Sequence, residues 1–176
     1  RVSLAGGTTE AVVPNPGVGT IRALAFDTTG RLYAAAGDSI YRVNLETLTS
    51  ELVRSGFSDI VYSLYFDGND TMYIGTRLNI HKYTVSTNTL ATIYSDVSSR
   101  YFNGITKVGQ YLYAMKTSFG MARLDLTNNQ MTLTYTTPPV TSGAGNLVEI
   151  NGIIYVLISS TLYSFNVNSS EWNTTA

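Results

Sequence analysis

Short apolar runs alternate with polar turns along most of the chain, and no helix-sized stretch carries the apolar spacing of an amphipathic helix. The runs are rich in Tyr, Thr, Val and Ile, which suit a pleated, half-buried strand. The turns between them carry Gly, Asn and Asp, which tolerate the positive φ angles of tight hairpins. The pattern predicts an all-β chain of short strands joined by hairpins.

One strand motif recurs along the chain as an apolar residue followed by tyrosine. The tyrosines are Tyr33, Tyr73, Tyr113 and Tyr155, with spacings of 40, 40 and 42 residues. An apolar strand and a turn precede each tyrosine, while a third strand, a polar turn and a weaker fourth strand follow it. Four short strands per unit of this length are typical of a β-propeller blade. A sandwich or barrel with regular strands is the alternative, but the repeat favours the propeller because it specifies strand order as well as spacing.

The repeats predict one domain over residues 1–176, made of four blades after an N-terminal half blade at residues 1–18. Residues 1–18 have the same order of elements as the second half of a blade, namely a strand, a polar turn, a Glu and another strand. The predicted blades are residues 19–55, 56–95, 96–136 and 137–176.

Four and a half blades allow three interpretations. The chain is a piece of a longer propeller, or its four blades close alone, or the half blade pairs with a neighbouring molecule. In the third case Val2, Leu4, Val12 and Val13 are the strand residues expected to pair, because an open half blade exposes unpaired backbone groups. A head-to-tail contact of this kind that does not close would build a filament.

The run at 24–35, which reads Leu-Ala-Phe-Asp-Thr-Thr-Gly-Arg-Leu-Tyr-Ala-Ala, resembles blades of NHL-repeat, YWTD-type and gluconolactonase-like propellers. A looser version stands at 64–75, and the generic resemblance covers residues 19–176. In the third and fourth repeats Lys107 and Glu149 replace the phenylalanine. The resemblance implies a propeller fold and says little about function.

Gluconolactonase-like enzymes hold a metal at the channel mouth with carboxylate and Asn ligands from several blades. This resemblance implies Asp59, Asn103 and Asn146, which precede the first strands of three blades, as the matching positions of a metal-dependent hydrolase. Asn residues at such places also cap turns, so the residues alone assign no metal ligand.

Composition excludes several classes of function. The net charge of −1 disfavours binding to a nucleic acid backbone. The longest apolar run, residues 153–158, is too short to cross a bilayer. The chain has no Cys, and therefore neither disulfides nor thiolate ligands, and a single His, so that His-based metal clusters are excluded. We expect no cofactor, no nucleic acid partner and no membrane span.

The candidate catalytic residues do not form a recognisable set. His81 is the only histidine, and a triad needs partners that its surroundings in the sequence do not supply. Asp27 and Asp67 occupy equivalent turns, where an aspartate usually caps the hairpin and less often binds Ca²⁺. We therefore expect no catalytic residue.

Aromatic and polar side chains gather where the first strands begin, at the predicted channel mouth. Aromatic rings beside Asn and Arg can stack on a sugar or contact a peptide, although packing between blades is the alternative. The candidate contacts are Arg22, Phe57, Asp59, Tyr62, Tyr101, Phe102, Asn103 and Asn146.

Three Asn-x-Ser/Thr sequons begin at Asn69, Asn168 and Asn173, all at predicted turns or on the outermost strand. Together with the low charge they favour a secreted or cell-surface glycoprotein. The sequence thus predicts a non-catalytic extracellular module that acts by contact with other chains, through self-association of the half blade, as a subunit of a fibre or similar assembly. A glycan- or peptide-binding propeller and a metal-dependent hydrolase are the alternatives.

Overall fold

The computed structural model describes residues 19–68, 70–97, 101–117, 120–135 and 144–175. The predicted half blade, with Val2, Leu4, Val12 and Val13, lies outside these residues, and so does Asn69. The described residues contain strands and turns, and none of them forms a helix that could span a membrane.

The chain forms four four-stranded antiparallel sheets, each built from strands consecutive in the sequence. Sheet 1 contains β1 (Ile21–Phe26), β2 (Leu32–Ala36), β3 (Ser39–Asn44) and β4 (Thr49–Arg54). Sheet 2 contains β5 (Ser63–Asp67), β6 (Thr71–Gly75), β7 (Asn79–Thr84) and β8 (Thr89–Ser95). Sheet 3 contains β9 (Phe102–Val108), β10 (Tyr111–Lys116), β11 (Gly120–Asp125) and β12 (Gln130–Tyr135). Sheet 4 contains β13 (Ala144–Ile150), β14 (Ile153–Ile158), β15 (Thr161–Asn166) and β16 (Glu171–Thr175). The predicted all-β class and the four four-stranded units are confirmed.

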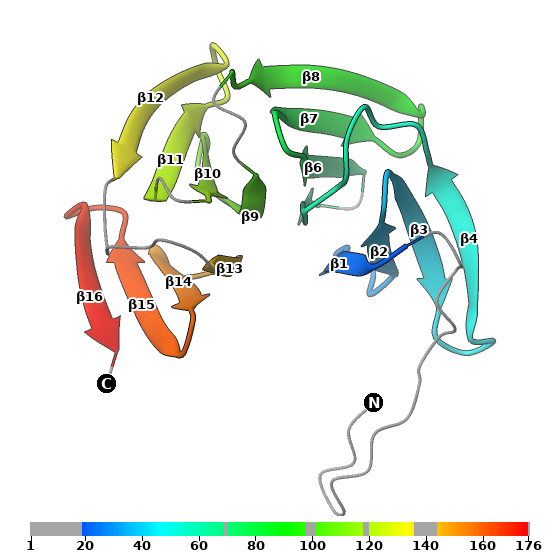
Figure 1. The fold of residues 1–176 in the computed structure, drawn as a ribbon, viewed down its shortest axis with the longest axis horizontal. Helices are drawn as coiled ribbons and strands as arrows, with labels where there is room; N and C mark the ends of the chain where they lie inside the picture. The colour runs from blue at the N-terminus through cyan, green and yellow to red at the C-terminus, as the bar shows by residue number, and fades with distance from the viewer. Residues whose placement is uncertain (1–18, 69, 98–100, 118–119, 136–143, 176) are drawn as a thin grey trace, which may run out of the picture.

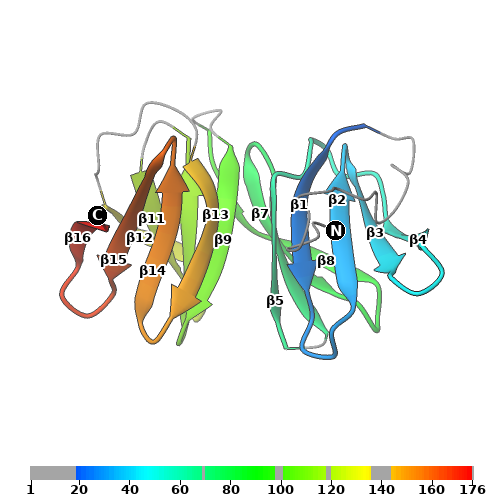
Figure 2. The same cartoon turned by 90° about the horizontal axis from the view of Figure 1, so that it is seen from below.

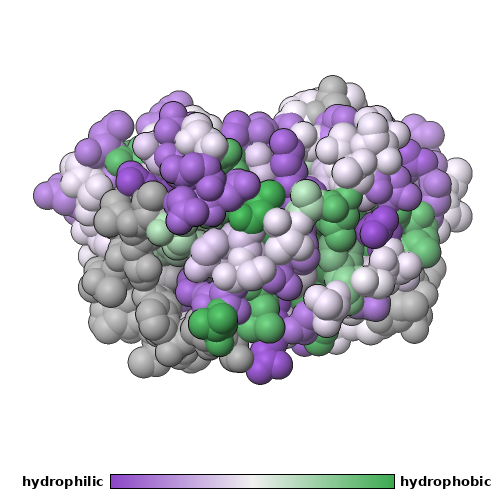
Figure 3. Space-filling model, turned by 90° about the horizontal axis from the view of Figure 1, so that it is seen from above, coloured by the Kyte–Doolittle hydropathy of each residue, from purple (hydrophilic) through white to green (hydrophobic). Residues whose placement is uncertain are grey.

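The sheets stand around an arc, with the first strand of each sheet innermost and the fourth outermost (Figure 1). Seen from the open side, sheets 1 and 2 form one half of the molecule and sheets 3 and 4 the other (Figure 2). On the convex side, small hydrophobic patches are scattered among hydrophilic atoms (Figure 3). The arc is open between sheet 4 and sheet 1, so the described residues do not form four blades closed on themselves.

Three apolar layers, one between each pair of neighbouring sheets, make most of the core, and a small fourth cluster of Leu32, Ala34 and Val43 is buried on the other face of sheet 1. Tyr33 and Ile40 of sheet 1 pack with Phe66 and Met72 of sheet 2 in the first layer. The second layer joins sheets 2 and 3, and the third joins sheets 3 and 4. The repeated tyrosine of each of the first three sheets points toward the following sheet. Since strand side chains alternate between the two faces, an inner sheet buries both of its faces.

The outer hairpins share one backbone feature. Leu48, Asn88, Asn129 and Ser170 occupy equivalent turn positions between the third and fourth strands, and each has a φ between 52° and 60°. Asn adopts this left-handed region at low cost, whereas Leu does not. The polar turns predicted from the sequence therefore follow one geometry, and Leu48 is the residue least suited to it.

Candidate binding site at the inner rim

The innermost strands of all four sheets begin at the same rim of the arc, and residues at or just before their starts, together with Thr117 after β10, line a cavity of about 600 Å³. We call it the inner-rim cavity. Its walls come from both ends of the chain because each sheet contributes the start of its first strand. The lining residues are Thr20, Ile21, Arg22, Tyr62, Tyr101, Asn103, Thr117, Gly145 and Asn146.

Two tyrosines whose rings are in contact form the aromatic wall of this cavity. The ring centroids of Tyr62 and Tyr101 are 4.5 Å apart, with the planes tilted by 40°. The Arg22 guanidinium lies 5.1 Å from the centre of the Tyr62 ring, and the Arg77 guanidinium lies 5.9 Å from that of Tyr101. Burial first, and the neighbouring Tyr101 phenol second, raise the pKa of Tyr62. The phenol therefore stays neutral and keeps its proton for hydrogen bonding.

Side-chain amides supply the polar part of the wall. Asn103 donates through Nδ2 to Oγ1 of Thr117 at 2.8 Å, and the Thr117 amide donates to the Tyr101 carbonyl at 3.0 Å. These bonds fix the Asn103 side chain beside the aromatic pair. Arg22 is the charged residue among those that line the cavity. Aromatic rings flanked by amides and one cation suit a polar ring that carries a negative group.

Gly104 allows the two asparagines to share the cavity. A Cβ atom at Gly104 would lie 2.8 Å from the Gly145 carbonyl oxygen and 3.1 Å from the Asn146 Cα atom. Both are backbone atoms, so a side chain at this position would force β9 and β13 apart. The close approach places Asn103, next to this glycine, near Asn146 on the adjacent sheet.

Five of the candidate contact residues line the cavity, namely Arg22, Tyr62, Tyr101, Asn103 and Asn146. Phe57 and Phe102 do not, because both are buried in layers between sheets, Phe57 in the first and Phe102 in the second. For these two residues the structure matches the packing alternative. Thr20, Ile21, Thr117 and Gly145 also line the cavity, and none of them is among the residues that the sequence predicts for this site. The antiparallel pairing of β10 with β9 was the signal that could have identified Thr117, since it returns the end of β10 to the start of β9.

Asp59 lies apart from the cavity walls, and its Oδ1 accepts a hydrogen bond from the Ile60 amide at 2.7 Å. Of the three metal-binding positions that the gluconolactonase-like resemblance implies, the cavity therefore holds Asn103 and Asn146 but not the carboxylate of Asp59. Across the part of the chain that the structure describes, no three His, Cys, Asp or Glu side chains are grouped as metal ligands.

His81 is a buried residue of the first layer. Its Nδ1 lies 3.0 Å from the Thr92 hydroxyl, and its ring centroid is 5.6 Å from that of Phe57. Burial lowers the pKa of His81, so the imidazole is neutral at pH 7. The location is that of a structural residue.

The two equivalent aspartates have different partners. Asp27 accepts hydrogen bonds from the Thr29 and Arg31 amides and an ion pair from the Arg31 guanidinium at 2.6 Å, so it caps its hairpin as predicted. Burial would raise the pKa of Asp27, but these hydrogen bonds outweigh it and the pKa is lowered. Asp67 instead binds Lys107 of the next sheet at 2.9 Å. That lysine stands where the first two repeats have phenylalanine.

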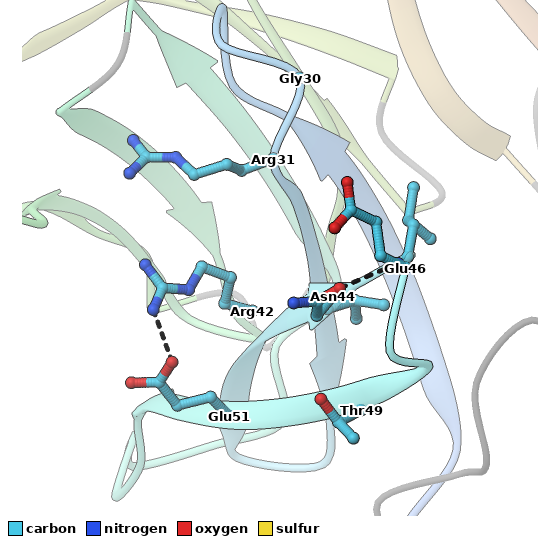
Figure 4. Close-up of a pocket in the computed structure, with 9 residues that line it drawn as sticks. Gly30, Arg31, Arg42, Asn44, Glu46, Thr49 and Glu51 are labelled. Carbon is cyan, nitrogen blue, oxygen red and sulfur yellow. Dashed lines mark hydrogen bonds and ion pairs between the residues drawn. The ribbon is translucent and has the colours of Figure 1, made fainter.

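A second cavity of about 600 Å³ lies at the edge of sheet 1 (Figure 4). Arg31 and Arg42 point to the same side of it, and Arg42 donates to Glu51 at 2.6 Å. Glu46 extends in a different direction, with its amide bonded to Asn44. Each arginine already has a carboxylate partner, and no pair of aromatic rings flanks this cavity.

The two described sequon asparagines are exposed, Asn168 in the turn between β15 and β16 and Asn173 on β16 itself. This is the accessibility that glycosylation requires. Their use as glycosylation sites stays a prediction.

No protein-family model matches the sequence, and no curated protein matches it. Solved structures do match the fold. The computationally designed protein Ika4 has a TM-score of 0.61 at 15% identity, with 96% of this chain and 98% of Ika4 covered. The computationally designed protein Ika8 has a TM-score of 0.62 at 15% identity, with 86% of this chain covered. The match takes in 47% of Ika8, so the chain spans about half of its length. At this identity the likeness concerns the fold alone.

Proposed function

We propose that the chain is a non-catalytic module that binds a short acidic oligosaccharide in the inner-rim cavity. The observation that carries this proposal is the Tyr62–Tyr101 ring pair with the Arg22 guanidinium over the Tyr62 ring, at a cavity that all four sheets help to line. The volume of about 600 Å³ lies within the range of small-molecule sites.

The chemistry of the wall favours a sugar over a hydrophobic ligand. The apolar face of a sugar ring packs on an aromatic ring while its hydroxyl groups bond to polar side chains nearby. Asn103, Asn146 and Thr117 offer amide and hydroxyl groups for this purpose. Arg22 favours a carboxylate on the sugar, because a guanidinium forms charge-assisted hydrogen bonds with it. A uronic acid combines both features.

An extracellular location is part of the proposal. Exposed sequons at Asn168 and Asn173 support it. Secretion from a eukaryotic host followed by enzymatic removal of N-glycans should lower the mass of the protein, and the Asn168→Gln and Asn173→Gln variants should assign the sites. An unchanged mass would count against this part.

The binding test uses trigalacturonic acid and its methyl ester, in which a methyl group on each carboxyl removes the negative charge. Titration calorimetry should detect the acid and show at least tenfold weaker binding of the ester. Tyr101→Ala should abolish binding, whereas Tyr101→Phe, which keeps the ring, should retain most of it. Arg22→Gln should remove the preference for the acid.

The matched control is Arg42→Gln, which makes the same charge change at the second cavity. It should bind both sugars like the unmodified chain. An equal loss of acid binding in Arg22→Gln and Arg42→Gln would show that the effect comes from net charge alone. If the unmodified chain binds neither sugar, the proposed ligand is wrong.

A further inference from the structure

The two end sheets of the arc each expose apolar side chains whose equivalents in inner sheets are buried. Sheet 1 lacks a preceding sheet and sheet 4 lacks a following one in the described part of the chain. The strand registers allow each exposed residue to be matched with its equivalents in the other sheets, because the first and second strands pair in the same way around each repeated tyrosine.

The face of sheet 1 that points away from sheet 2 is equivalent to the face that each later sheet packs against the sheet before it. On this face Leu32, Ala34 and Val43 are buried, whereas apolar side chains of β1 are exposed. Leu24 of sheet 1 is 53% exposed, whereas its equivalents Leu64 and Leu147 are 7% and 6% exposed. Phe26 is 59% exposed, and its equivalent Phe66 is 8% exposed. Leu64 and Phe66 owe their burial to the first layer, where they pack on sheet 1.

The exposed face of sheet 4 points away from sheet 3. It is equivalent to the face that each earlier sheet packs against the sheet that follows it. Leu157 is 54% exposed, whereas its equivalent Met115 in sheet 3 is 1% exposed. Leu162 is 38% exposed, and its equivalent Met121 is fully buried. Both methionines lie in the third layer, against sheet 4.

The molecule therefore presents the two halves of its own inter-sheet contact at its two ends. Within the chain, an equivalent of Leu157 and an equivalent of Leu24 share an apolar layer. Ala35 and Leu64 share the first layer, and Met115 and Leu147 share the third layer. Sheets 1 and 4 stand on opposite sides of the arc with the open side between them (Figure 1), so one copy cannot bring its own two end faces together without a change in the arc.

We propose that a second copy of the chain covers both faces, with sheet 4 of each copy packed on sheet 1 of the other to close a ring of eight sheets. Two equal contacts related by a twofold axis then repeat the layers already present inside the chain. All the exposed apolar residues at these positions would be buried, and none of the sheets would keep an uncovered end face. The inner-rim cavities of the two copies would open onto one central channel.

The first test measures the mass of the full 176-residue chain by light scattering over a range of concentrations. One chain has a mass of 19.1 kDa, so the ring has twice that mass, 38.2 kDa. The expected result is the dimer mass at micromolar concentration. A single-chain mass at every concentration, or a mass that keeps growing with concentration, would overturn the proposal.

Charged substitutions test the pairing of the faces. Leu24→Asp and Leu157→Lys each place a charge in both contacts of the dimer, so each variant alone should have half the mass of the unmodified protein. Mixed together, the two variants should recover the dimer mass. One contact of the mixed dimer then has no substitution, and the other joins the introduced aspartate of one copy to the introduced lysine of its partner.

Val97→Asp is the control, since Val97 is fully exposed and follows β8 away from both faces. It should remain dimeric. Circular dichroism checks that all variants are folded, which the exposure of both leucines favours. Dimers in both single variants, or failure of the mixture to recover the dimer, would overturn the proposed contact.

Discussion

Lys116 at the end of β10 forms a buried ion pair with Asp96, which follows β8, and so ties sheet 3 to sheet 2. Their side chains are 9% and 7% exposed, and the lysine ammonium also lies 5.8 Å from the centre of the Phe102 ring. The removal of one partner of such a pair leaves a charge in a poorly solvated place. The pair lies close to the start of β9, where the inner-rim cavity begins.

Lys116→Met should lower the free energy of unfolding by about 3–5 kcal/mol because it leaves Asp96 buried without its counter-ion. Lys107→Met makes the same change in the pair with Asp67, whose side chains are 25% and 36% exposed, and should cost less than about 1 kcal/mol. Urea denaturation of both variants measures the difference. Equal effects would show that burial does not set the strength of the Lys116 pair.

Gly104→Ala should destabilise the chain by about 1–3 kcal/mol, since the added methyl group meets backbone atoms of β13 that cannot move independently. Gly145→Ala is the comparison at the same sheet contact, where the nearest backbone atom to a Cβ would be 3.4 Å away. Thermal melts of the two variants should differ clearly. A Gly104→Ala variant as stable as Gly145→Ala would contradict the close approach of β9 and β13.

Leu48→Asn should stabilise the protein by about 1 kcal/mol, because Leu48 has a φ of 55° and asparagine tolerates this conformation better. The side chain is 43% exposed, so little packing is lost. Leu45→Asn provides the control, as Leu45 is similarly exposed and does not have a positive φ. It should give no stabilisation in denaturant titrations, and a gain of the same size there would refute the backbone explanation.

Stability should fall between pH 7 and pH 5 because of His81. Burial holds the pKa of His81 below the ordinary value of 6.5, so the unfolded chain binds a proton at a pH where the folded chain does not. The contribution of the neutral histidine is complete above pH 6.5 and is lost as the pH falls toward the native pKa. His81→Leu should flatten this part of the pH–stability curve, measured by urea denaturation at several pH values. Asp27 cannot produce the same effect. Its pKa is lowered from 3.8, so the stability that the ionised carboxylate contributes is lost only at lower pH, as the pH falls through that range.

The sequence by itself determined the strands, their order and the rim at which the candidate site lies. The tyrosine repeat places a strand pair at the same point of each unit, and the alternation of side chains divides every strand between two faces. Because equivalent strand starts must gather at one rim of any array of such units, Arg22, Tyr101 and Asn146 could be assigned to a common place without coordinates.

The tertiary structure decided which side chains at that rim are available. Phe57 and Phe102 belong to the same aromatic pattern as Tyr62 and Tyr101, yet they are buried between sheets. Strand alternation cannot distinguish these cases, because Phe57, Tyr62 and Tyr101 lie in the connections that precede β5 and β9 and not on a strand. The pairing of Lys116 with Asp96, the burial of His81 and the exposure of Leu24 and Leu157 depend likewise on which sheet stacks on which. Those contacts join residues far apart in the chain, and no local pattern encodes them.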